Sequence, residues 1–286
     1  MSFRRTDFTL FWTLPPDGVD WQNLALARVR RMQLVAALAG RDLLLRLRDA
    51  GVQGVTVRMN EEDYATHEAR LRARDRIAPL LALGVDIVIV GVEPEHAFDF
   101  RYNSPGWGQD AAFAHSSNLR EMLGLLRPLG VRVASPGWTS RAKDMNWREG
   151  LFPGEQTWLE ITREVYNACD LNGFHWYSYD GTDYDVRERM RRTLWQEQER
   201  RHLPIYIDEV GVDRGTPVQR MGIYLHLATL LLDSTSNQPF ALSGARVAAL
   251  TPFVSNGNGV GWDIRYLIRD PMAYQMVGRF LSGENF

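Results

Sequence analysis

The stretch LALGVDIVIVGVEPE, residues 81–95, contains the pattern that predicts the fold. A helical segment ends at Leu83, just before Gly84, an apolar run extends to Gly91, and two acids follow at Glu93 and Glu95. Glycine just past a helix end supplies the left-handed turn that leads the chain back into a sheet. A continuous apolar run is typical of a strand buried on both faces, as in a parallel sheet. The stretch therefore predicts one βα repeat with acids at the carboxyl end of its strand.

This alternation recurs along the chain, and repeated βα units predict a parallel sheet covered by helices. Strands are predicted at Phe8–Leu14, Val52–Met59, Val85–Gly91, Val131–Ser135, Phe174–Ser178, Ile205–Asp208 and Ala248–Val254. Helices are predicted at Glu61–Leu83, Ser116–Leu129, Glu155–Ala168, Asp185–Arg201 and Pro217–Asp233. We expect an α/β fold, a (β/α)8 TIM barrel that is irregular or incomplete in its first two strands. Residues 20–50 lack a clear strand pattern, and Gln33–Leu38 is the candidate for the missing strand.

The composition is that of a globular protein with a sizeable core. Of the 286 residues, 45% are hydrophobic and 24% are charged, close to the averages for globular domains. No linker or composition shift divides the chain, so we expect residues 1–286 to form a single catalytic barrel domain. The net charge is −2, and acids and bases are mixed throughout. Because there is neither a basic face nor a polybasic anchor, we expect no nucleic-acid or membrane partner.

Cysteine content and the amino-terminal residues bear on localisation. Cys169 is the only cysteine, so an intramolecular disulfide is excluded. The start, MSFRRTDFTLFWTLPPDG, lacks the apolar core and the cleavage site of a signal peptide. We expect a cytoplasmic protein, unless a secretion signal has been removed. The sequence carries no indication of the oligomeric state.

Two acids at the ends of separate predicted strands form the strongest candidate site. Glu93 follows the run VDIVIVGV, and Glu209 follows the apolar run in LPIYIDEVGVDR. A single carboxylate at a strand end often caps a helix or pairs with an arginine. Two carboxylates from separate strands fit the pair used in glycoside hydrolysis. The active face of a βα barrel lies at the carboxyl ends of its strands, where both acids are expected.

Polar side chains near other strand ends could complete this site. In VTVRMN, Arg58 and Asn60 share one side of a strand, and a buried arginine needs a partner such as a carboxylate. In GFHWYSY, His175 and Tyr177 share one face and could orient a carboxylate or a sugar hydroxyl. A buried histidine and tyrosine bonded to backbone carbonyls is an equally good interpretation of this second pattern.

Aromatic residues are frequent in the segments that follow predicted strands. Trp138 lies in the segment after one strand, and Trp262 follows a glycine-rich segment near the carboxyl terminus. A flat indole ring could form a platform for a sugar. Packing of the segment onto the barrel is the simpler interpretation of any single aromatic residue.

These motifs resemble the clan A glycoside hydrolases, which are retaining (β/α)8-barrel enzymes. Their pattern has Asn-Glu-Pro at the end of strand four, a histidine or aromatic pair after strand six, and Glu at the end of strand seven, as in Thr-Glu-Phe-Gly. Here GVEPEH, GFHWYSY and YIDEVG are similar to these motifs and occur in the same order. The resemblance covers residues 52–262. One position departs from it, because Val92 stands where the clan has Asn.

The resemblance implies that Glu93 is the general acid/base and Glu209 the nucleophile of a double displacement. It also implies that Tyr177 hydrogen-bonds the nucleophile, that His175 lines the site and that Trp262 supports the sugar. We therefore expect a retaining glycoside hydrolase that cleaves an oligo- or polysaccharide, with no cofactor and no metal ion.

Two alternatives remain open. A catalytically impaired sugar-binding barrel would keep the acids without the activity, and Val92 favours it because the clan's Asn binds the 2-hydroxyl of the sugar. A metal-dependent TIM-barrel isomerase or lyase would use carboxylates and imidazoles as ligands of a divalent ion. Its candidate ligands are Glu93, Glu95, His96, His175, Asp208 and Glu209. No known metal-binding spacing is matched by them.

Overall fold

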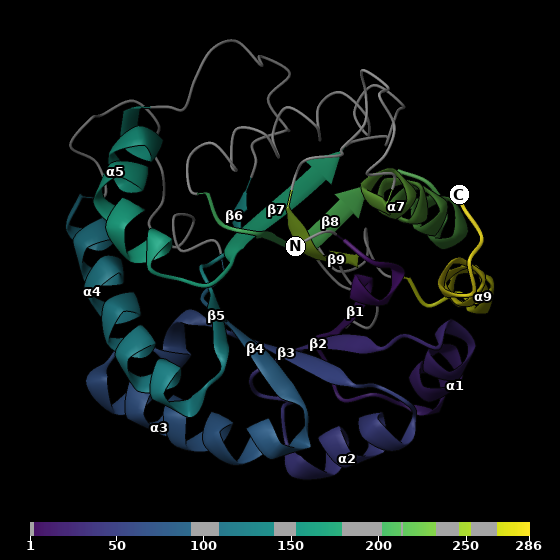
Figure 1. Ribbon diagram of the computed structural model, residues 1–286, viewed down its shortest axis with the longest axis horizontal. Coiled ribbons are helices and arrows are strands. Elements are labelled where there is room, and N and C mark those ends of the chain that lie inside the picture. Colours follow the sequence, from purple (N-terminus) through teal and green to yellow (C-terminus); the bar gives the residue numbers. More distant parts are fainter. Residues whose placement is uncertain are drawn as a thin grey trace.

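The computed structural model describes residues 3–92, 109–139, 153–178, 202–212, 214–232, 246–252 and 268–286. In these segments strands alternate with helices, and the helices lie outside the strands (Figure 1). The strands are β1 Thr9–Trp12, β2 Arg31–Val35, β3 Gly54–Met59, β4 Val85–Val90, β5 Arg132–Ala134, β6 Trp138–Thr139, β7 Asn172–Ser178, β8 Ile205–Val212 and β9 Val247–Pro252. The α-helices are α1 Gly18–Ala27, α2 Arg41–Asp49, α3 His67–Ile77, α4 Gln109–Leu126, α5 Pro153–Asn167, α7 Pro217–Leu232 and α9 Pro271–Leu281. Short 3-10 helices are η1 Arg5–Asp7, η2 Glu61–Asp63, η3 Ala78–Leu83 and η5 Arg127–Leu129.

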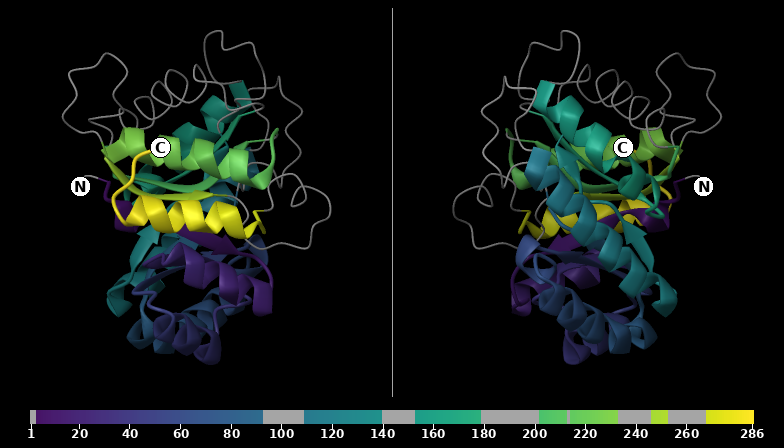
Figure 2. Two further views of the ribbon diagram at one scale, coloured as in Figure 1. Left: turned by 90° about the vertical axis from the view of Figure 1, so that its right-hand side faces the viewer. Right: turned by 90° about the vertical axis from the view of Figure 1, so that its left-hand side faces the viewer.

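The strands form two parallel sheets whose order follows the chain. One sheet has the order β1-β2-β3-β4-β5 and the other the order β6-β7-β8-β9. Single parallel bridges join their edges, from Phe8 to Leu250 and from Ala134 to Leu171. Helix α9, the last of the chain, lies between α7 and α1 and packs against both, so the end of the chain contacts its beginning (Figure 2). Parallel strands in chain order with helices outside them are the arrangement of a βα barrel, and the predicted α/β class is confirmed.

The missing strand is β2, which lies between β1 and β3 and overlaps the candidate segment Gln33–Leu38. The first two strands are therefore both in place. The sequence conceals β2 because Arg31 and Gln33 alternate with apolar residues and break the apolar run. Gln33 is buried, and its Nε2 donates a hydrogen bond to the backbone oxygen of Asp208 over 3.2 Å, so its amide N–H has a partner inside the fold.

Other predicted elements overlap the observed ones with shifted ends. The helix expected from Glu61 begins at His67, because residues 61–63 form a 3-10 turn and Thr66 caps the helix that follows. Helices α1, α2 and α9 are additional to the predicted set. The helix expected at Asp185–Arg201 lies outside the described residues. Within the described segments, none of the helices has both the length and the apolar character needed to cross a membrane.

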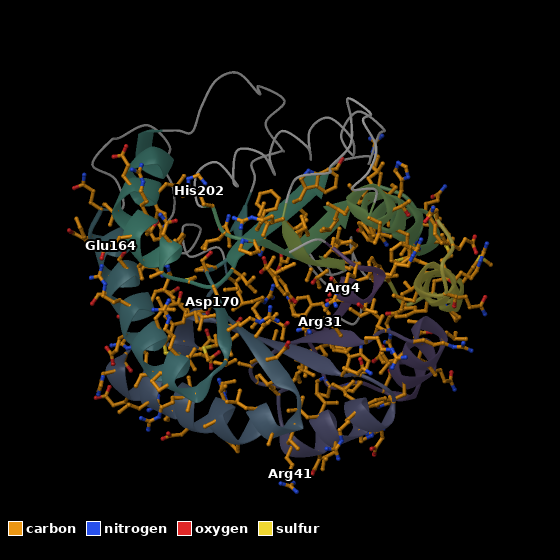
Figure 3. The ribbon with its side chains drawn as sticks, viewed as in Figure 1. Arg4, Arg31, Arg41, Glu164, Asp170 and His202 are labelled. Carbon is orange, nitrogen blue, oxygen red and sulfur yellow. The ribbon has the colours of Figure 1, made fainter. Side chains whose placement is uncertain are left out.

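Apolar side chains pack on both sides of the strands. The larger cluster, which includes Val88 and Val90 of β4, lies between the strands and the helices. A smaller inner cluster consists of Ile87, Ile89, Ala134, Leu171, Tyr206 and Ala249. Alternate residues of β4 thus join opposite layers, as expected for a strand buried on both faces. Figure 3 shows side chains filling the space that the strands surround.

An ion-pair network links the strands near their amino-terminal ends. Nη2 of Arg31 lies 2.5 Å from Oδ1 of Asp86, and Nη2 of Arg132 lies 3.2 Å from Oδ2 of the same carboxylate. Gly54 leaves space for Arg31, because a Cβ at this position would overlap its guanidinium group. The polar residues of the candidate site lie toward the opposite ends of the strands.

Candidate active site

Strand β8 places two successive acids on the same side of the sheet. Ile207 pairs with Phe174 of β7, whereas Glu209 pairs with His175, so Asp208 is an extra residue in the ladder. Such a β-bulge interrupts the alternation of side chains between the two faces. Strict alternation would turn one of the two carboxylates toward the helices. Because of the bulge, both carboxylates are buried and both contact the imidazole of His175.

Glu209 receives polar contacts from β3 and β7. Nη1 of Arg58 on β3 pairs with Oε1, and the hydroxyl of Tyr177 on β7 donates a hydrogen bond to Oε2. Nδ1 of His175 lies 3.4 Å from Oε2. Only 3% of Glu209 is exposed. The carboxylate is therefore held in one orientation, and the guanidinium group matches its charge.

Arg58 is a buried cation with two favourable neighbours. Its guanidinium carbon lies 4.3 Å from the centroid of the Phe11 ring, a cation–π contact that adds to the ion pair with Glu209. Arg58 is only 6% exposed, so an unpaired guanidinium group here would be costly. The carboxylate that the sequence requires beside Arg58 is thus Glu209.

His175 lies between the two acids of β8. Its Nε2 is 3.0 Å from Oδ2 of Asp208, while its Nδ1 faces Glu209. Oδ1 of Asp208 also accepts a hydrogen bond from the backbone N–H of Phe174 over 3.1 Å. Gly137 makes room for this pair, because a Cβ at residue 137 would overlap Nε2 of His175 and lie 2.7 Å from Oδ1 of Asp208. The imidazole is completely enclosed, with 0% of its residue surface exposed.

The predicted site residues form three groups: those gathered around Glu209, those described elsewhere in the structure, and those outside the described segments. Those brought together are Arg58, His175, Tyr177 and Glu209. Asn60 begins the turn η2, where its Nδ2 donates a hydrogen bond to Oε1 of Glu62 over 3.2 Å. Trp138 belongs to β6, in register with Phe174 of β7. Predicted residues outside the described segments are Glu93, Glu95, His96 and Trp262.

The backbone before Glu93 lies beside this site. Val92 forms a parallel bridge with Gly137, the residue that makes room for His175 and Asp208. Gly91 precedes it with a φ of 99°, a left-handed conformation that favours glycine. The backbone that follows β4 therefore runs parallel to the backbone at Gly137.

Three residues of the site have roles that the sequence did not predict. The sequence indicates Asp208 only as a possible metal ligand. The signal for its place in the site is the pair Asp208-Glu209, two acids in succession after an apolar run. Phe11 of β1 contacts Arg58 of β3 across β2, and Gly137 is required by packing against β7 and β8. These last two contacts arise from the tertiary fold, so no local pattern indicates them. Among the described residues, no cluster of three or more His, Cys, Asp or Glu side chains could hold a metal ion.

A second buried histidine lies among the helices. His115 of α4 contacts the hydroxyl of Tyr64 through Nδ1, at 3.4 Å, and the hydroxyl of Tyr166 through Nε2, at 3.1 Å. Its ring stacks on Trp158, with centroids 5.6 Å apart. Burial lowers the pKa of His115 to about 3, so the ring is neutral near pH 7.

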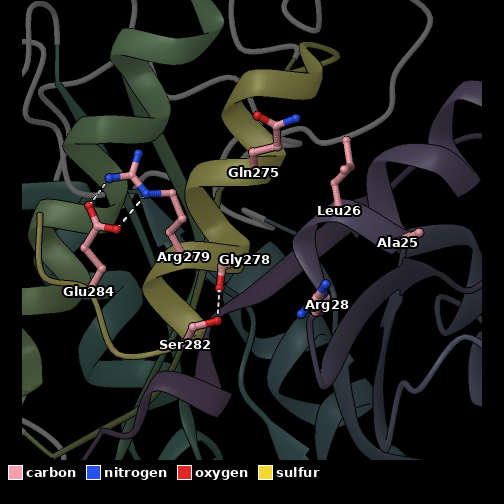
Figure 4. A pocket seen from close by; sticks show the side chains of 8 residues that line it. All are labelled: Ala25, Leu26, Arg28, Gln275, Gly278, Arg279, Ser282 and Glu284. Atoms are coloured by element: carbon pink, nitrogen blue, oxygen red, sulfur yellow. Dashed lines mark hydrogen bonds and ion pairs between the residues drawn. The ribbon is translucent and has the colours of Figure 1, made fainter.

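A surface pocket of about 580 Å³ lies elsewhere, between α1 and α9 (Figure 4). Arg279 and Glu284 form an ion pair on its wall, with Nε of Arg279 donating to Oε2 over 2.6 Å. Gly278 allows α9 to approach α1, because a Cβ there would overlap the backbone oxygen of Leu26. The pocket is lined by residues of the two helices and the carboxyl-terminal segment, and it includes none of the four residues gathered around Glu209.

Comparisons with known protein families and with curated protein sequences give no match. Solved structures do match. A GH128 (subgroup II) endo-β-1,3-glucanase from Sorangium cellulosum is 14% identical over 94% of this chain and 98% of that chain, with a TM-score of 0.58. An endo-β-1,4-mannanase from Thermotoga petrophila is 12% identical over 100% of this chain and 78% of that chain, with a TM-score of 0.57. A GH128 (subgroup III) curdlan-specific exo-β-1,3-glucanase from Blastomyces gilchristii, solved with glucose, is 14% identical over 93% and 97% of the two chains, with a TM-score of 0.53. The chain shares its fold with these carbohydrate-cleaving enzymes.

Proposed function

We propose that the protein is a retaining glycoside hydrolase that cleaves O-glycosidic bonds in an oligo- or polysaccharide. Glu209 is the nucleophile and Glu93 the general acid/base. The observation that carries the proposal is the setting of Glu209, a buried carboxylate that is held by Arg58 and Tyr177 within β8, a strand that continues past the predicted end at Asp208 to Val212. A nucleophile must be oriented before its substrate arrives, and two donors from separate strands supply that orientation.

The mechanism is a double displacement. Glu209 attacks the anomeric carbon while Glu93 gives a proton to the leaving oxygen, and a glycosyl ester on Glu209 results. Water then enters, Glu93 takes its proton, and the sugar leaves with its original anomeric configuration. During the attack the negative charge of Glu209 is consumed. Arg58 and Tyr177 hold the carboxylate oxygens throughout and stabilise the carboxylate that departs in the second step.

The role of Glu93 is supported by the path of the chain that leads to it. Val92 bridges Gly137, and Gly137 is packed against His175 and Asp208. Val92, the last described residue before Glu93, therefore lies beside the neighbours of Glu209. For a retaining enzyme the two carboxyl groups must lie about 5–5.5 Å apart.

Sugar contacts are proposed for Asn60, Trp138 and Trp262. Asn60 follows β3 two residues after Arg58, and Trp138 is the β6 residue next to Gly137. Indole rings support sugars through their flat apolar faces, while an amide binds hydroxyl groups. A polymer of β-linked glucose or mannose is the first substrate class to test, because the similar solved structures include a β-1,3-glucanase and a β-1,4-mannanase.

The test is a screen of aryl β-glycosides, β-1,3-glucan and β-1,4-mannan with wild type and matched variants. We expect Glu93→Gln and Glu209→Gln each to reduce cleavage, the latter by roughly 10⁴-fold or more, as expected for loss of a nucleophile. Glu164→Gln is the control, because Glu164 is an exposed residue of α5 that pairs only at the surface with Arg120. Full activity in either site variant would refute the assignment. Circular dichroism of each variant separates lost chemistry from lost folding.

A second candidate, an impaired sugar-binding barrel, is favoured by one observation, which is Val92 in place of the clan's Asn. It predicts that wild type binds an oligosaccharide in calorimetry and cleaves none of the panel. Val92→Asn then tests the cause, because a gain of cleavage would identify the missing contact with the 2-hydroxyl. Stoichiometric bound metal in the purified protein, with activity lost on chelation, would instead support the metal-dependent alternative.

A further inference from the structure

Gln33 makes a hydrogen bond across the space that the strands surround. Its Nε2 donates to the backbone oxygen of Asp208 over 3.2 Å, although β1 and β9 lie between β2 and β8. Neither residue has exposed surface. A carbonyl oxygen only accepts, so the N–H end of the side-chain amide must face Asp208. The bond therefore ties together two strands that are not neighbours in either sheet.

The acceptor is the carbonyl group of the bulged residue of β8. In the register with β7, residues 207–209 lie opposite residues 174–175, and in the register with β9, residues 207–210 lie opposite residues 250–252. Strand β8 thus has one residue more than each neighbour, and the ladder is interrupted at Asp208 on both sides. A buried carbonyl at such an interruption needs a donor from elsewhere. The side-chain amide from β2 supplies it.

This carbonyl belongs to the peptide group that joins Asp208 to Glu209. A peptide group is planar, so the direction of its oxygen sets the direction of the Glu209 N–H and restricts where the Glu209 side chain points. The Asp208 carboxylate is held from β7, where Oδ1 accepts the N–H of Phe174 and Oδ2 lies 3.0 Å from Nε2 of His175. Asp208 is thus held at its side chain by β7 and at its backbone by β2.

Gln33 lies one layer away from the ion pair of Glu209. Its register partner on β3 is Thr56, and Arg58, two residues further along, lies on the same face of that strand. The layer of Gln33 is therefore nearer the amino-terminal ends of the strands than the layer of Arg58. Because Gln33 is fully buried, it can affect a substrate only through the residues above it.

The two ends of the Gln33 amide differ in their partners. Nε2 bonds to Asp208, whereas Oε1 has no hydrogen-bond partner among the residues that the structure describes. A buried acceptor without a partner is costly, so it offsets part of what the N–H contributes to stability. We therefore expect the amide to matter more for the orientation of Asp208 than for the stability of the core.

We propose that Gln33 is a positioning residue for Glu209. Its N–H fixes the peptide group between Asp208 and Glu209 at the bulge. That peptide group in turn directs the carboxylate toward Arg58 and Tyr177, the two donors that hold it. The effect on catalysis rests on the proposed function, whereas the orientation of the peptide group is a property of the folded protein.

The direct test is triple-resonance NMR spectroscopy of the full-length protein with Gln33→Met, which keeps the length of the side chain and removes the amide. The ¹³C shift of the Asp208 carbonyl reports its hydrogen bond, and the ¹³Cζ shift of Tyr177 reports the bond to Glu209. We expect the carbonyl carbon to move upfield, because a hydrogen bond deshields it, and the Tyr177 signal to move as well. A wild-type position of either signal would overturn the proposal.

Thr56→Val is the matched control. It removes a buried hydroxyl of the same layer, the acceptor of a 2.9 Å hydrogen bond from Tyr206, with little change in shape. We expect the Asp208 and Tyr177 signals to keep their wild-type positions in this variant. Equal shifts in the two variants would overturn the specific role of Gln33, because any lost polar contact in this layer would then disturb the site.

A crystal structure of the wild type keeps the test decisive if Gln33→Met does not fold. We expect the side-chain amide of Gln33 to lie within hydrogen-bond distance of the Asp208 oxygen. An amide directed away from that oxygen would overturn the proposal.

The catalytic consequence is measured with a glycoside that wild type cleaves. Gln33→Met should lower kcat by about 10- to 100-fold, since a small misplacement of a reacting group is enough for an effect of this size. KM should change little, because Gln33 does not touch the substrate, and Thr56→Val should keep both constants. An unchanged kcat in Gln33→Met would overturn the positioning role. If wild type cleaves no glycoside, the proposed function fails, and the NMR signals still decide whether Gln33 orients Glu209.

Discussion

The two buried histidines of this protein have opposite surroundings. His115 lies among helices with two tyrosine hydroxyls and a tryptophan ring around it, and burial lowers its pKa to about 3. His175 lies in the middle of β7 between two carboxylates. Neither ring is accessible, with 4% and 0% of the residue exposed. Equal burial therefore accompanies two different kinds of site.

The difference shows that partners, rather than burial, decide what a histidine can do. A tyrosine hydroxyl can donate or accept, so a neutral ring satisfies both of its nitrogens at His115. A carboxylate only accepts, so the hydrogen bond between Nε2 of His175 and Asp208 requires a proton on Nε2. The first arrangement stabilises helix packing around α4. The second places the ring beside Asp208 and Glu209, where chemistry is proposed.

The largest expected effect comes from removing Arg58, the cation that pairs with Glu209 beside His175. Arg58→Met leaves Glu209 buried without its guanidinium partner, and breaking a buried pair in this way typically costs about 3–5 kcal/mol. Arg58→Lys is the matched control, because it keeps the charge beside Glu209. Urea unfolding measures both variants. A loss below about 1 kcal/mol for Arg58→Met would mean that the pair is not a buried ion pair of the kind described.

The neutral histidine should make stability depend on pH. The unfolded chain takes up a proton at His115 below its ordinary pKa of 6.5, while the folded ring does not until about pH 3. Its contribution is therefore complete above pH 6.5 and is lost progressively as the pH falls toward 3. Between about pH 7.5 and about pH 4.5, wild type should lose about 2–3 kcal/mol more than His115→Phe, at 1.36 kcal/mol for each pH unit below the ordinary pKa. Parallel losses in the two proteins would show that His115 becomes protonated inside the fold.

The smallest effect tests the space around His175. Gly137→Ala should cost about 1–3 kcal/mol, because the added methyl group overlaps the imidazole and overpacks a filled site. It should also change the ring signals of His175 and leave those of His115 in place. Gly124→Ala is the control, since a Cβ there meets nothing within 4 Å and helix α4 should gain about 0.5–1 kcal/mol. Equal stability of the two variants would contradict the close packing of Gly137 against His175.

The parts of the fold that are predictable from sequence are those with local signals. The run before Gly91 predicts β4, and glycines past helix ends mark the returns into the sheet. Strand β2 lacks such a signal, because it buries the polar residue Gln33, and the amide N–H of Gln33 finds its partner at the backbone of Asp208, which is remote in sequence. Helix boundaries shifted where caps such as Thr66 compete with continued periodicity.

The candidate site was partly predictable for the same reason. Strand parity places Arg58 on the inner side and requires an anion near it, and the structure supplies Glu209. Parity cannot predict the bulge at Asp208, which depends on the register between β7 and β8. Without that bulge, Glu209 and Asp208 could not both reach His175. The feature that distinguishes the surroundings of His175 from those of His115 is therefore a tertiary feature.

The most direct test of the central claim is covalent labelling of Glu209. A 2-deoxy-2-fluoro glycosyl fluoride slows both steps of a double displacement, but its good leaving group lets the glycosyl-enzyme form and persist. Gluco- and manno-configured reagents are used, with peptide mapping by mass spectrometry. We predict one added fluorosugar on the peptide that contains Glu209, and none in Glu209→Gln. The same adduct on a different residue, or in Glu209→Gln, would contradict the account.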